Sequence, residues 1–287
     1  MNNQHTFLAP AKINLFLHIT GQRDDGYHTL QSIFLFLDFY DKIQLTVTDN
    51  GQITRSSLID NVPAEQDLCV RAAKALQHAT GCKLGVDITL DKHIPMGGGL
   101  GGGSSDAATI LLALNKLWHL NLDRARLMEI GLKLGADVPV FIFGQTAWAE
   151  GIGEQLTAIN LPKIFEEQYF VVITPQIHVS TAHIFNNSRL TKDTKPLKIA
   201  DFSEGTYSKL FRNDLEKVVR DEFLAVENTI GWLNNFGQAR MSGSGASVFV
   251  AVNSKDVAEK ILAQKPSNTV GFVAKGLKYH PHYGLTK

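Results

Sequence analysis

The sequence predicts an α+β fold in which mixed β-sheets pack against helices, divided into two domains near residue 160. Strand-like and helix-like segments follow one another in both halves without the strict alternation of a doubly wound fold. The 287 residues, 44% of them hydrophobic, are enough to bury one large core or two smaller ones. An irregular stretch surrounds Pro162. We therefore expect an N-terminal domain over residues 1–160 and a C-terminal domain over residues 161–287.

The first sixty residues are predicted to be mainly β. Between residues 7 and 20, apolar side chains at every second position indicate a strand. Residues 28–39 and 42–48 are predicted as two further strands. The turn sequence Asp49-Asn50-Gly51 favours a hairpin that leads into a strand at Ile53.

Helices become frequent after residue 66. Asp67 is a suitable cap for a helix that runs to about Thr80, and Gly81 is suited to end it. The elements expected next are a strand at residues 86–90, a helix capped by Ser104 or Ser105, a helix at residues 123–134, and strands at residues 138–143, 147–150 and 169–174.

The second half has the same mixed character. The elements expected there are helices at residues 181–185, 223–236 and 256–263, strands at residues 247–252 and 271–274, and a surface loop at residues 191–200.

Composition excludes several function classes. Lys and Arg together number 28, as do Asp and Glu, so no overall positive field favours nucleic acid or an anionic membrane, and an anionic ligand needs a local site. The ten histidines form no H-E-x-x-H pattern, which argues against a zinc hydrolase. Cys69 and Cys82 fit free thiols in a reducing compartment, and the first residues lack a signal-peptide pattern. We expect a cytoplasmic protein, and the sequence indicates no protein partner.

Residues 95–108, PMGGGLGGGSSDAA, contain six glycines among the seven positions 97–103. Glycines let backbone N–H groups surround a polyphosphate, and the helix that follows adds free N–H donors and the positive end of its dipole. The segment therefore predicts an anion-binding loop. A loop that merely connects a strand to a helix is the less favoured alternative.

The loop does not fit two well-known phosphate-binding patterns. Ser104 follows Gly103 where a Walker A loop needs lysine. Gly97, Gly99 and Gly102 match G-x-G-x-x-G, but a Rossmann loop also needs an acid after the next strand, whereas Asp123 follows a predicted helix. We therefore expect neither a P-loop nor a dinucleotide-binding fold.

The loop instead resembles the phosphate loop of the GHMP superfamily, which comprises galactokinase, homoserine kinase, mevalonate kinase and phosphomevalonate kinase. LGADVPVF at residues 134–141 and SGSGASVFV at residues 242–250 are similar to further motifs of that superfamily. The resemblance implies a two-domain, ATP-dependent small-molecule kinase, with ATP binding and catalysis in the N-terminal domain and substrate binding in the C-terminal one. The residues implied to hold ATP are Pro95, Met96, Gly97, Gly98, Gly99, Leu100, Gly101, Gly102, Gly103, Ser104 and Ser105. Lys92, just before the loop, is a further candidate to reach the nucleotide or its phosphates, with a solvated lysine as the equally favoured alternative. Mg²⁺ would arrive with ATP, with the hydroxyl of Ser104 or Ser105 as a candidate ligand.

A narrower resemblance lies in AKINLFLHITGQRDDGYHTLQSIF at residues 11–34, supported by AEGIGE at 149–154 and GFVAKG at 271–276. These segments are similar to the superfamily members that phosphorylate a cytidine diphosphate-linked methylerythritol at its 2-hydroxyl, in non-mevalonate isoprenoid synthesis. In those kinases a lysine and an aspartate face the attacking hydroxyl, and they match Lys12 and Asp137. An aspartate could accept or orient the hydroxyl proton, and a lysine could offset charge on the transferring phosphoryl group.

The same resemblance implies a pocket for the cytidine group. Tyr27 and Phe185 would stack on the pyrimidine ring, His28 would bond its polar edge, and Thr181 and Asn14 would also bind substrate. A superfamily kinase for homoserine or a mevalonate-like alcohol is one alternative, and a non-catalytic nucleotide sensor is another. Asp67 stands where these kinases commonly carry asparagine, which leaves an adenine or ribose contact from that position open.

Overall fold

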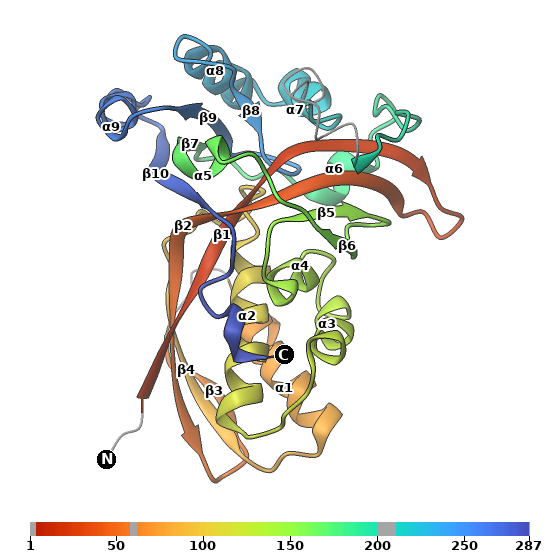
Figure 1. Ribbon diagram of the computed structural model, residues 1–287, viewed down its shortest axis with the longest axis vertical. Coiled ribbons are helices and arrows are strands. Elements are labelled where there is room, and N and C mark those ends of the chain that lie inside the picture. The colour runs from red at the N-terminus through yellow and green to blue at the C-terminus, as the bar shows by residue number, and fades with distance from the viewer. Residues whose placement is uncertain (1–3, 58–61, 200–210, 287) are drawn as a thin grey trace.

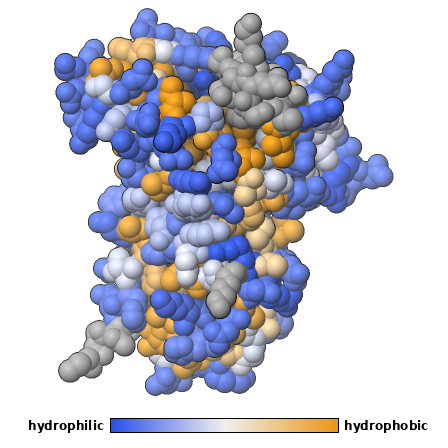
Figure 2. Space-filling model, viewed as in Figure 1, coloured by the Kyte–Doolittle hydropathy of each residue, from blue (hydrophilic) through white to orange (hydrophobic). Residues whose placement is uncertain are grey.

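The structure, a computed structural model, describes residues 4–57, 62–199 and 211–286. Figure 1 shows a lower part that contains α1 (Leu68–Thr80), α2 (Gly102–Leu117) and α3 (Arg124–Leu132), and an upper part that contains α8 (Leu224–Leu233) and α9 (Lys255–Ala263). The long strands β1 (Gln4–Gln22) and β2 (His28–Thr48) run through both parts. Hydrophilic side chains predominate on the face seen in Figure 2, with smaller groups of hydrophobic ones among them.

The other strands are β3 (Ile53–Arg55), β4 (Gly85–Asp91), β5 (Ala147–Glu150), β6 (Gln155–Ala158), β7 (Tyr169–Pro175), β8 (Arg240–Met241), β9 (Val248–Val252) and β10 (Thr269–Leu277). The other helices are α4 (Val138–Phe143), α5 (Ile164–Glu167), α6 (Thr181–Phe185) and α7 (Glu216–Glu222), with 3-10 turns at Ala64–Gln66 and Tyr283–Leu285. Within the described ranges, every helix is too short or too polar to cross a membrane.

One mixed sheet connects the two parts. Its strand order is β3-β4-β2-β10-β7-β9-β8, with β1 paired along β2 and the β5–β6 pair attached to β2. The pairing that joins the C-terminal strands to this sheet is short, because β10 pairs with β2 only at Gly276 and Leu277. A strand of the predicted C-terminal domain thus pairs with a strand of the predicted N-terminal domain. The domain boundary near residue 160 stays a prediction.

Among the residues that the structure describes, hydrophobic side chains form three buried clusters. One lies between the lower sheet and α1, α2, α3 and α4, and a second packs α7, α8 and α9 onto β7 and β9. The third lies between them and includes Ile13, Phe16 and Leu35 from the β1–β2 pair, together with Phe170 from β7. The predicted α+β class with mixed sheets and packed helices is thus confirmed.

Helix α1 follows the predicted capping chemistry. Asp67 accepts a hydrogen bond from the backbone N–H of Cys69, and Gly81 ends the helix with φ of 67°. The expected elements in the second half also occur at α6, α8, α9, β9 and β10, with small differences at their ends.

Four local predictions were wrong. Residues 138–143 form helix α4 instead of a strand, because a short run of buried apolar residues has no periodicity that separates the two, and Pro139 fits the first turn of a helix. Residues 28–48 form the single strand β2 instead of the two strands predicted at residues 28–39 and 42–48. The turn at residues 49–51 does not close a hairpin, because β3 pairs in parallel with β4. Helix α2 begins at Gly102, before either predicted serine cap.

Candidate active site around the glycine loop

The glycine loop connects β4 to α2 in a conformation that favours glycine. Gly97, Gly99 and Gly101 have φ values of 67°, 74° and 73°, in the left-handed region that L side chains rarely adopt. Gly101 is the N-cap of α2, so the first N–H groups of the helix have no partner inside it. The loop therefore has the backbone geometry of an anion site.

A second turn, residues 242–247, holds the loop from the other half of the chain. Ser242 Oγ donates to the carbonyl oxygen of Gly99 at 3.0 Å, and the N–H of Ser247 donates to the carbonyl oxygen of Gly98 at 3.1 Å. A Cβ atom at Gly99 would lie 2.1 Å from the carbonyl oxygen of Ser242. Close contact between two glycine-containing turns thus fixes the position of the loop.

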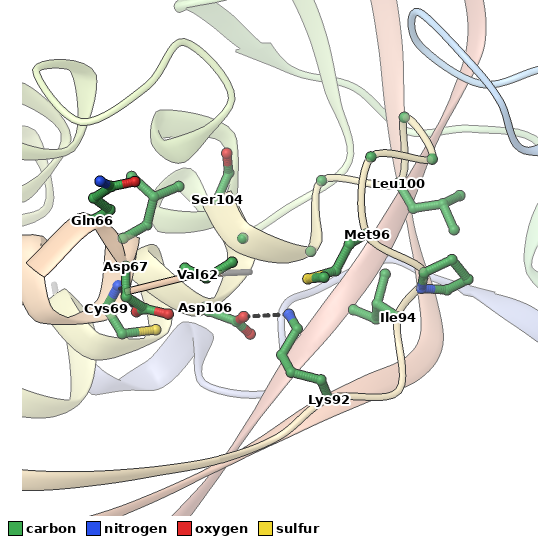
Figure 3. A pocket seen from close by; sticks show the side chains of 18 residues that line it. Val62, Gln66, Asp67, Cys69, Lys92, Ile94, Met96, Leu100, Ser104 and Asp106 are labelled. Atoms are coloured by element: carbon green, nitrogen blue, oxygen red, sulfur yellow. Dashed lines mark hydrogen bonds and ion pairs between the residues drawn. The ribbon is translucent and has the colours of Figure 1, made fainter. Parts of the chain in front are cut away.

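Two cavities flank the loop. The first, here the α1 cavity, has a volume of about 350 Å³ and extends from the start of α1 to the loop (Figure 3). Its lining residues are Val62, Gln66, Asp67, Leu68, Cys69, Lys92, Ile94, Pro95, Met96, Gly97, Gly98, Gly99, Leu100, Gly101, Gly102, Gly103, Ser104 and Asp106.

The second, here the α4 cavity, has a volume of about 320 Å³ and reaches the N-cap of α4. Its lining residues are Lys12, Asn14, Leu17, Leu30, Phe34, Gly97, Gly99, Ser104, Ala136, Asp137, Ile152, Gly153, Thr181, Phe185, Gly243 and Ser244. Gly97, Gly99 and Ser104 line both cavities, so the loop is a wall that the two share.

Lys12 lines the α4 cavity and contacts the loop that the two cavities share. Its ammonium donates to Asn14 Oδ1 at 2.7 Å and to the carbonyl oxygen of Gly99 at 2.9 Å, and it lies 3.5 Å from Asp137 Oδ2. The Lys12 side chain is only 3% exposed, whereas that of Asp137 is 39% exposed. One buried cation is therefore in contact with the loop and next to an accessible carboxylate.

The carboxylate of Asp137 does not cap the helix that it precedes. Asp137 occupies the N-cap position of α4, yet its side chain accepts no capping hydrogen bond. Aspartate at that position often bonds the N–H groups of the first turn. Here the Asp137 carboxylate borders the α4 cavity and its charge is opposed by Lys12.

Lys92 lies in the wall of the α1 cavity between two buried acids. Its ammonium contacts Asp41 Oδ2. It also lies 2.5 Å from Asp106 Oδ2, a contact that Figure 3 shows as a dashed line. Burial lowers the pKa of the Lys92 ammonium, but the two carboxylates more than offset burial and raise that pKa overall. Lys92 therefore stays charged in this cavity.

Some of the residues predicted to hold a pyrimidine lie together around α6, but Tyr27 does not. Thr181 and Phe185 line the α4 cavity, and the His28 ring packs against Phe185 with centroids 5.6 Å apart. Burial, followed by the charge of Lys192, lowers the pKa of His28, and its Nε2 has no hydrogen-bond partner among the described residues. Tyr27 is 60% exposed and lines neither cavity.

The two serines after the loop differ in access. Ser104 lines both cavities, whereas Ser105 is fully buried and lines neither. Among the residues that the structure describes, no three His, Cys, Asp or Glu side chains are arranged to hold a metal ion. Ser104 and Asp137 still offer the oxygen donors that Mg²⁺ prefers when it arrives with phosphates.

Sequence reasoning missed several lining residues. Asp106 follows the loop directly and could have been noticed as an acid inside an anion-binding motif. Leu30 and Phe34 lie on β2, and Ile152 and Gly153 lie in the turn between β5 and β6, so long-range strand pairing that no local signal reveals brings them to the α4 cavity.

The glycine loop and the second turn lie inside regions that match known protein families. Residues 67–145 match the GHMP kinases N terminal domain, and residues 198–267 match the GHMP kinases C terminal domain.

Two relatives that match nearly the whole chain carry the same name. The chain is 51% identical over 284 residues to a 4-diphosphocytidyl-2-C-methyl-D-erythritol kinase of Burkholderia multivorans, covering 97% of this chain and 96% of the relative. It is 52% identical over 277 residues to the kinase of the same name from Thiobacillus denitrificans, covering 96% and 97%.

Solved structures agree in fold. A crystal structure of 4-(cytidine 5'-diphospho)-2C-methyl-D-erythritol kinase is 31% identical with a TM-score of 0.81, covering 95% of this chain and 99% of the other. Homoserine kinase from Cytophaga hutchinsonii, at 16% identity and a TM-score of 0.69, covers 98% and 97% and shares the fold.

Proposed function

The chain belongs to the 4-diphosphocytidyl-2-C-methyl-D-erythritol kinases within the GHMP kinase family, and from this premise we propose which of its residues carry out the reaction. The reaction uses ATP to phosphorylate the 2-hydroxyl of that substrate and yields the 2-phosphate and ADP. It serves the non-mevalonate route to isoprenoid precursors.

The observation that carries the assignment is the contact of Lys12 with both the shared loop and Asp137. Its ammonium donates to the Gly99 carbonyl oxygen of the loop and lies 3.5 Å from Asp137 Oδ2 in the α4 cavity. ATP would occupy the α1 cavity with its phosphates along the loop and the N-terminus of α2. The substrate alcohol would occupy the α4 cavity, so the γ-phosphoryl group passes over the shared wall at Gly97, Gly99 and Ser104.

In the proposed step, Asp137 orients the 2-hydroxyl and takes its proton as the oxygen attacks the γ-phosphorus. The bond from that phosphorus to the β,γ-bridging oxygen breaks, and ADP leaves. Lys12 lies beside Asp137 and offsets negative charge on the phosphoryl group. Phosphoryl transfer depends mainly on positioning and electrostatics, so one acid and one cation beside the bound nucleotide are sufficient protein groups.

Mg²⁺ is proposed to enter with ATP and to neutralise phosphate charge. Ser104 is the better candidate ligand of the two serines, because it lines both cavities while Ser105 is buried. Lys92 would partly neutralise the two carboxylates, Asp41 and Asp106, that lie beside the bound nucleotide.

The cytidine end of the substrate is proposed to lie near α6. Phe185 would stack on the pyrimidine, and the unpartnered Nε2 of His28 beside it would bond the polar edge of the ring. Tyr27, exposed at the β1–β2 turn, would cover the other face only after it moves toward the cavity. Thr181 and Asn14 complete the proposed contacts. Both cysteines are free thiols, which suits the proposed cytoplasmic location.

The test is ADP release from ATP and Mg²⁺ with 4-diphosphocytidyl-2-C-methyl-D-erythritol, beside homoserine, mevalonate and a substrate-free control. Turnover only with the cytidylyl substrate is expected. Turnover with another alcohol would reject the substrate assignment, and nucleotide binding without turnover would favour a sensor.

A further inference from the structure

The buried charge cluster under the α1 cavity has one unsatisfied atom. Lys92 bridges two carboxylates, Asp41 from β2 and Asp106 from α2. Asp41 is fully buried, and its Oδ1 accepts from the N–H groups of His93 and Ile94 at 2.6 and 2.8 Å. Asp106 is 3% exposed, but its Oδ1 has no hydrogen-bond partner among the residues that the structure describes.

An orphan carboxylate oxygen in such a place is costly. A buried polar atom without a partner loses its bonds to water and gains nothing in return. Burial accordingly raises the pKa of Asp106 to about 7, even though Lys92 acts in the opposite direction. A ligand that offers a hydrogen-bond donor at this point would remove the cost.

The chemistry of a nucleotide limits which group can be that donor. Phosphate oxygens accept hydrogen bonds, and a free carboxylate also only accepts, so the two do not pair. The donors on an adenine nucleotide are the ribose hydroxyls and the exocyclic amino group of the base.

The position of Asp106 selects between these donors. The phosphates belong at the loop and the first N–H groups of α2, which places the base toward Val62, Gln66 and Leu68 at the other end of the cavity. Asp106 lies between the two ends: in Figure 3 it points toward Lys92 on one side and has Cys69 on the other. Its charge also acts on the thiol of Cys69 and contributes to raising the pKa of that thiol, as expected of two groups that lie close together.

We propose that Asp106 is a nucleotide-binding residue whose Oδ1 accepts a hydrogen bond from a ribose hydroxyl. Lys92 and Asp41 act as positioning residues, because Lys92 holds the second oxygen of Asp106 and Asp41 holds Lys92. The cluster therefore recognises the sugar, while the loop recognises the phosphates. This inference rests on the proposed function in that it takes the α1 cavity as the ATP site.

The test is calorimetric measurement of dissociation constants for ADP, 2′-deoxy-ADP, 3′-deoxy-ADP and IDP at pH 8, where the Asp106 carboxylate is mainly ionised. The wild-type chain should bind one of the deoxynucleotides ~10-fold to 100-fold more weakly than ADP, because the analogue leaves a buried acceptor unpaired. Asp106→Ala should bind ADP and both deoxynucleotides within ~3-fold of one another, because the orphan acceptor is gone.

Two further variants keep the result interpretable. Asp106→Asn, which preserves shape, should retain a deoxynucleotide discrimination several times smaller than that of the wild type, and it decides the matter if Asp106→Ala does not fold. Asp91→Asn is the matched control, because Asp91 is an exposed carboxylate that lines neither cavity, so its discrimination should equal that of the wild type.

The inference would be overturned if the wild type bound ADP, 2′-deoxy-ADP and 3′-deoxy-ADP with equal affinity. It would also be overturned if Asp106→Ala discriminated against the deoxynucleotides as strongly as the wild type does. If Asp106→Ala lost only the preference for ADP over IDP and kept its discrimination against the deoxynucleotides, Asp106 would contact the base and not the ribose. That result would also overturn the inference. ADP release in the kinase assay tests the proposed function separately: turnover without sugar discrimination rejects only the role of Asp106, and sugar discrimination without turnover rejects only the kinase.

Discussion

The two cavities that flank the glycine loop are built in different ways. The α1 cavity comes from two short stretches of chain, residues 62–69 and 92–106. The α4 cavity takes its walls from the long strands, the loop, the start of α4, the β5–β6 turn, α6 and the second turn at residues 242–247. The first is therefore a local structure and the second depends on the whole fold. Substitutions should separate the two cavities, except in the loop that they share.

Removal of the Asp137 carboxylate should have the largest effect on turnover, and that effect should be confined to the α4 cavity. Asp137→Ala is expected to lower kcat by ~10³-fold, because it removes the group that orients and accepts the proton. ATP affinity should stay within ~3-fold of the wild type, because Lys12 keeps its bonds to Asn14 and Gly99. Steady-state kinetics and calorimetry measure the two quantities. A parallel loss of ATP binding in a folded variant would contradict the separation.

A methyl group on the shared loop should instead affect both sides. Gly99→Ala forces a left-handed φ on alanine and places its Cβ 2.1 Å from the Ser242 carbonyl oxygen. We expect a loss of ~3 kcal/mol in the free energy of unfolding, from strain plus overpacking. ATP affinity and turnover should both fall, as measured by calorimetry and steady-state kinetics, and urea unfolding gives the loss of stability.

Gly81→Ala is the matched control, because Gly81 has φ of +67° and no atom lies within 4 Å of the position that a Cβ would take there. It should cost only ~1 kcal/mol and leave ligand binding intact. If both variants lose the same stability and both bind ATP normally, the contact between the two turns does not hold the loop.

The same contrast explains what the sequence could predict. The α1 cavity was foreseeable where a local rule applied: six glycines before a helix indicate an anion site, and Asp67 with Gly81 marks both ends of α1. The start of α2 was misplaced because Gly101 itself provides the cap, so the serines after it are already helical.

The α4 side was less predictable because its contacts are long-range. Lys12 and Asp137 were identified by resemblance, and no periodicity relates two residues 125 positions apart that lie 3.5 Å from each other. Residues 138–143 were predicted as a strand because six buried apolar residues satisfy both a short strand and a short helix. Parallel pairing of β3 with β4 likewise depends on where α1 packs.

Acid should weaken the lower part through a histidine beneath α2. His280 Nε2 lies 3.4 Å from Thr109 Oγ1, and burial lowers the His280 pKa to about 3, with His282 and Arg124 acting in the same direction. The folded state therefore binds a proton less readily than the unfolded state, whose histidine titrates near 6.5. The associated stability is complete above pH ~6.5 and is lost as the pH falls, by ~2 kcal/mol between pH 7 and pH 5.

His280→Gln should flatten that pH dependence in urea unfolding experiments. His28→Gln, at the α4 side, is the comparison variant, because the His28 pKa is lowered by less complete burial. It should remove a smaller part of the slope. An unchanged slope in His280→Gln would place the acid sensitivity elsewhere.

The smallest expected effect is that of Thr181→Val, which should change the KM for one substrate and not the other. Thr181 Oγ1 lies 2.7 Å from Ser244 Oγ at the rim of the α4 cavity. Thr181→Val keeps the shape but removes the hydroxyl, so KM for the cytidylyl substrate should rise ~5-fold while KM for ATP changes less than ~2-fold.

Thr20→Val serves as control for Thr181→Val, because it also removes a hydroxyl that is paired with another hydroxyl, Thr29 Oγ1 at 3.1 Å, but lines neither cavity. It should change neither KM. Equal increases of both KM values in Thr181→Val would mean that Ser244, once released, lets the second turn move against the loop. The two cavities would then be coupled through residues 242–247, and the α1 cavity would no longer be a purely local structure.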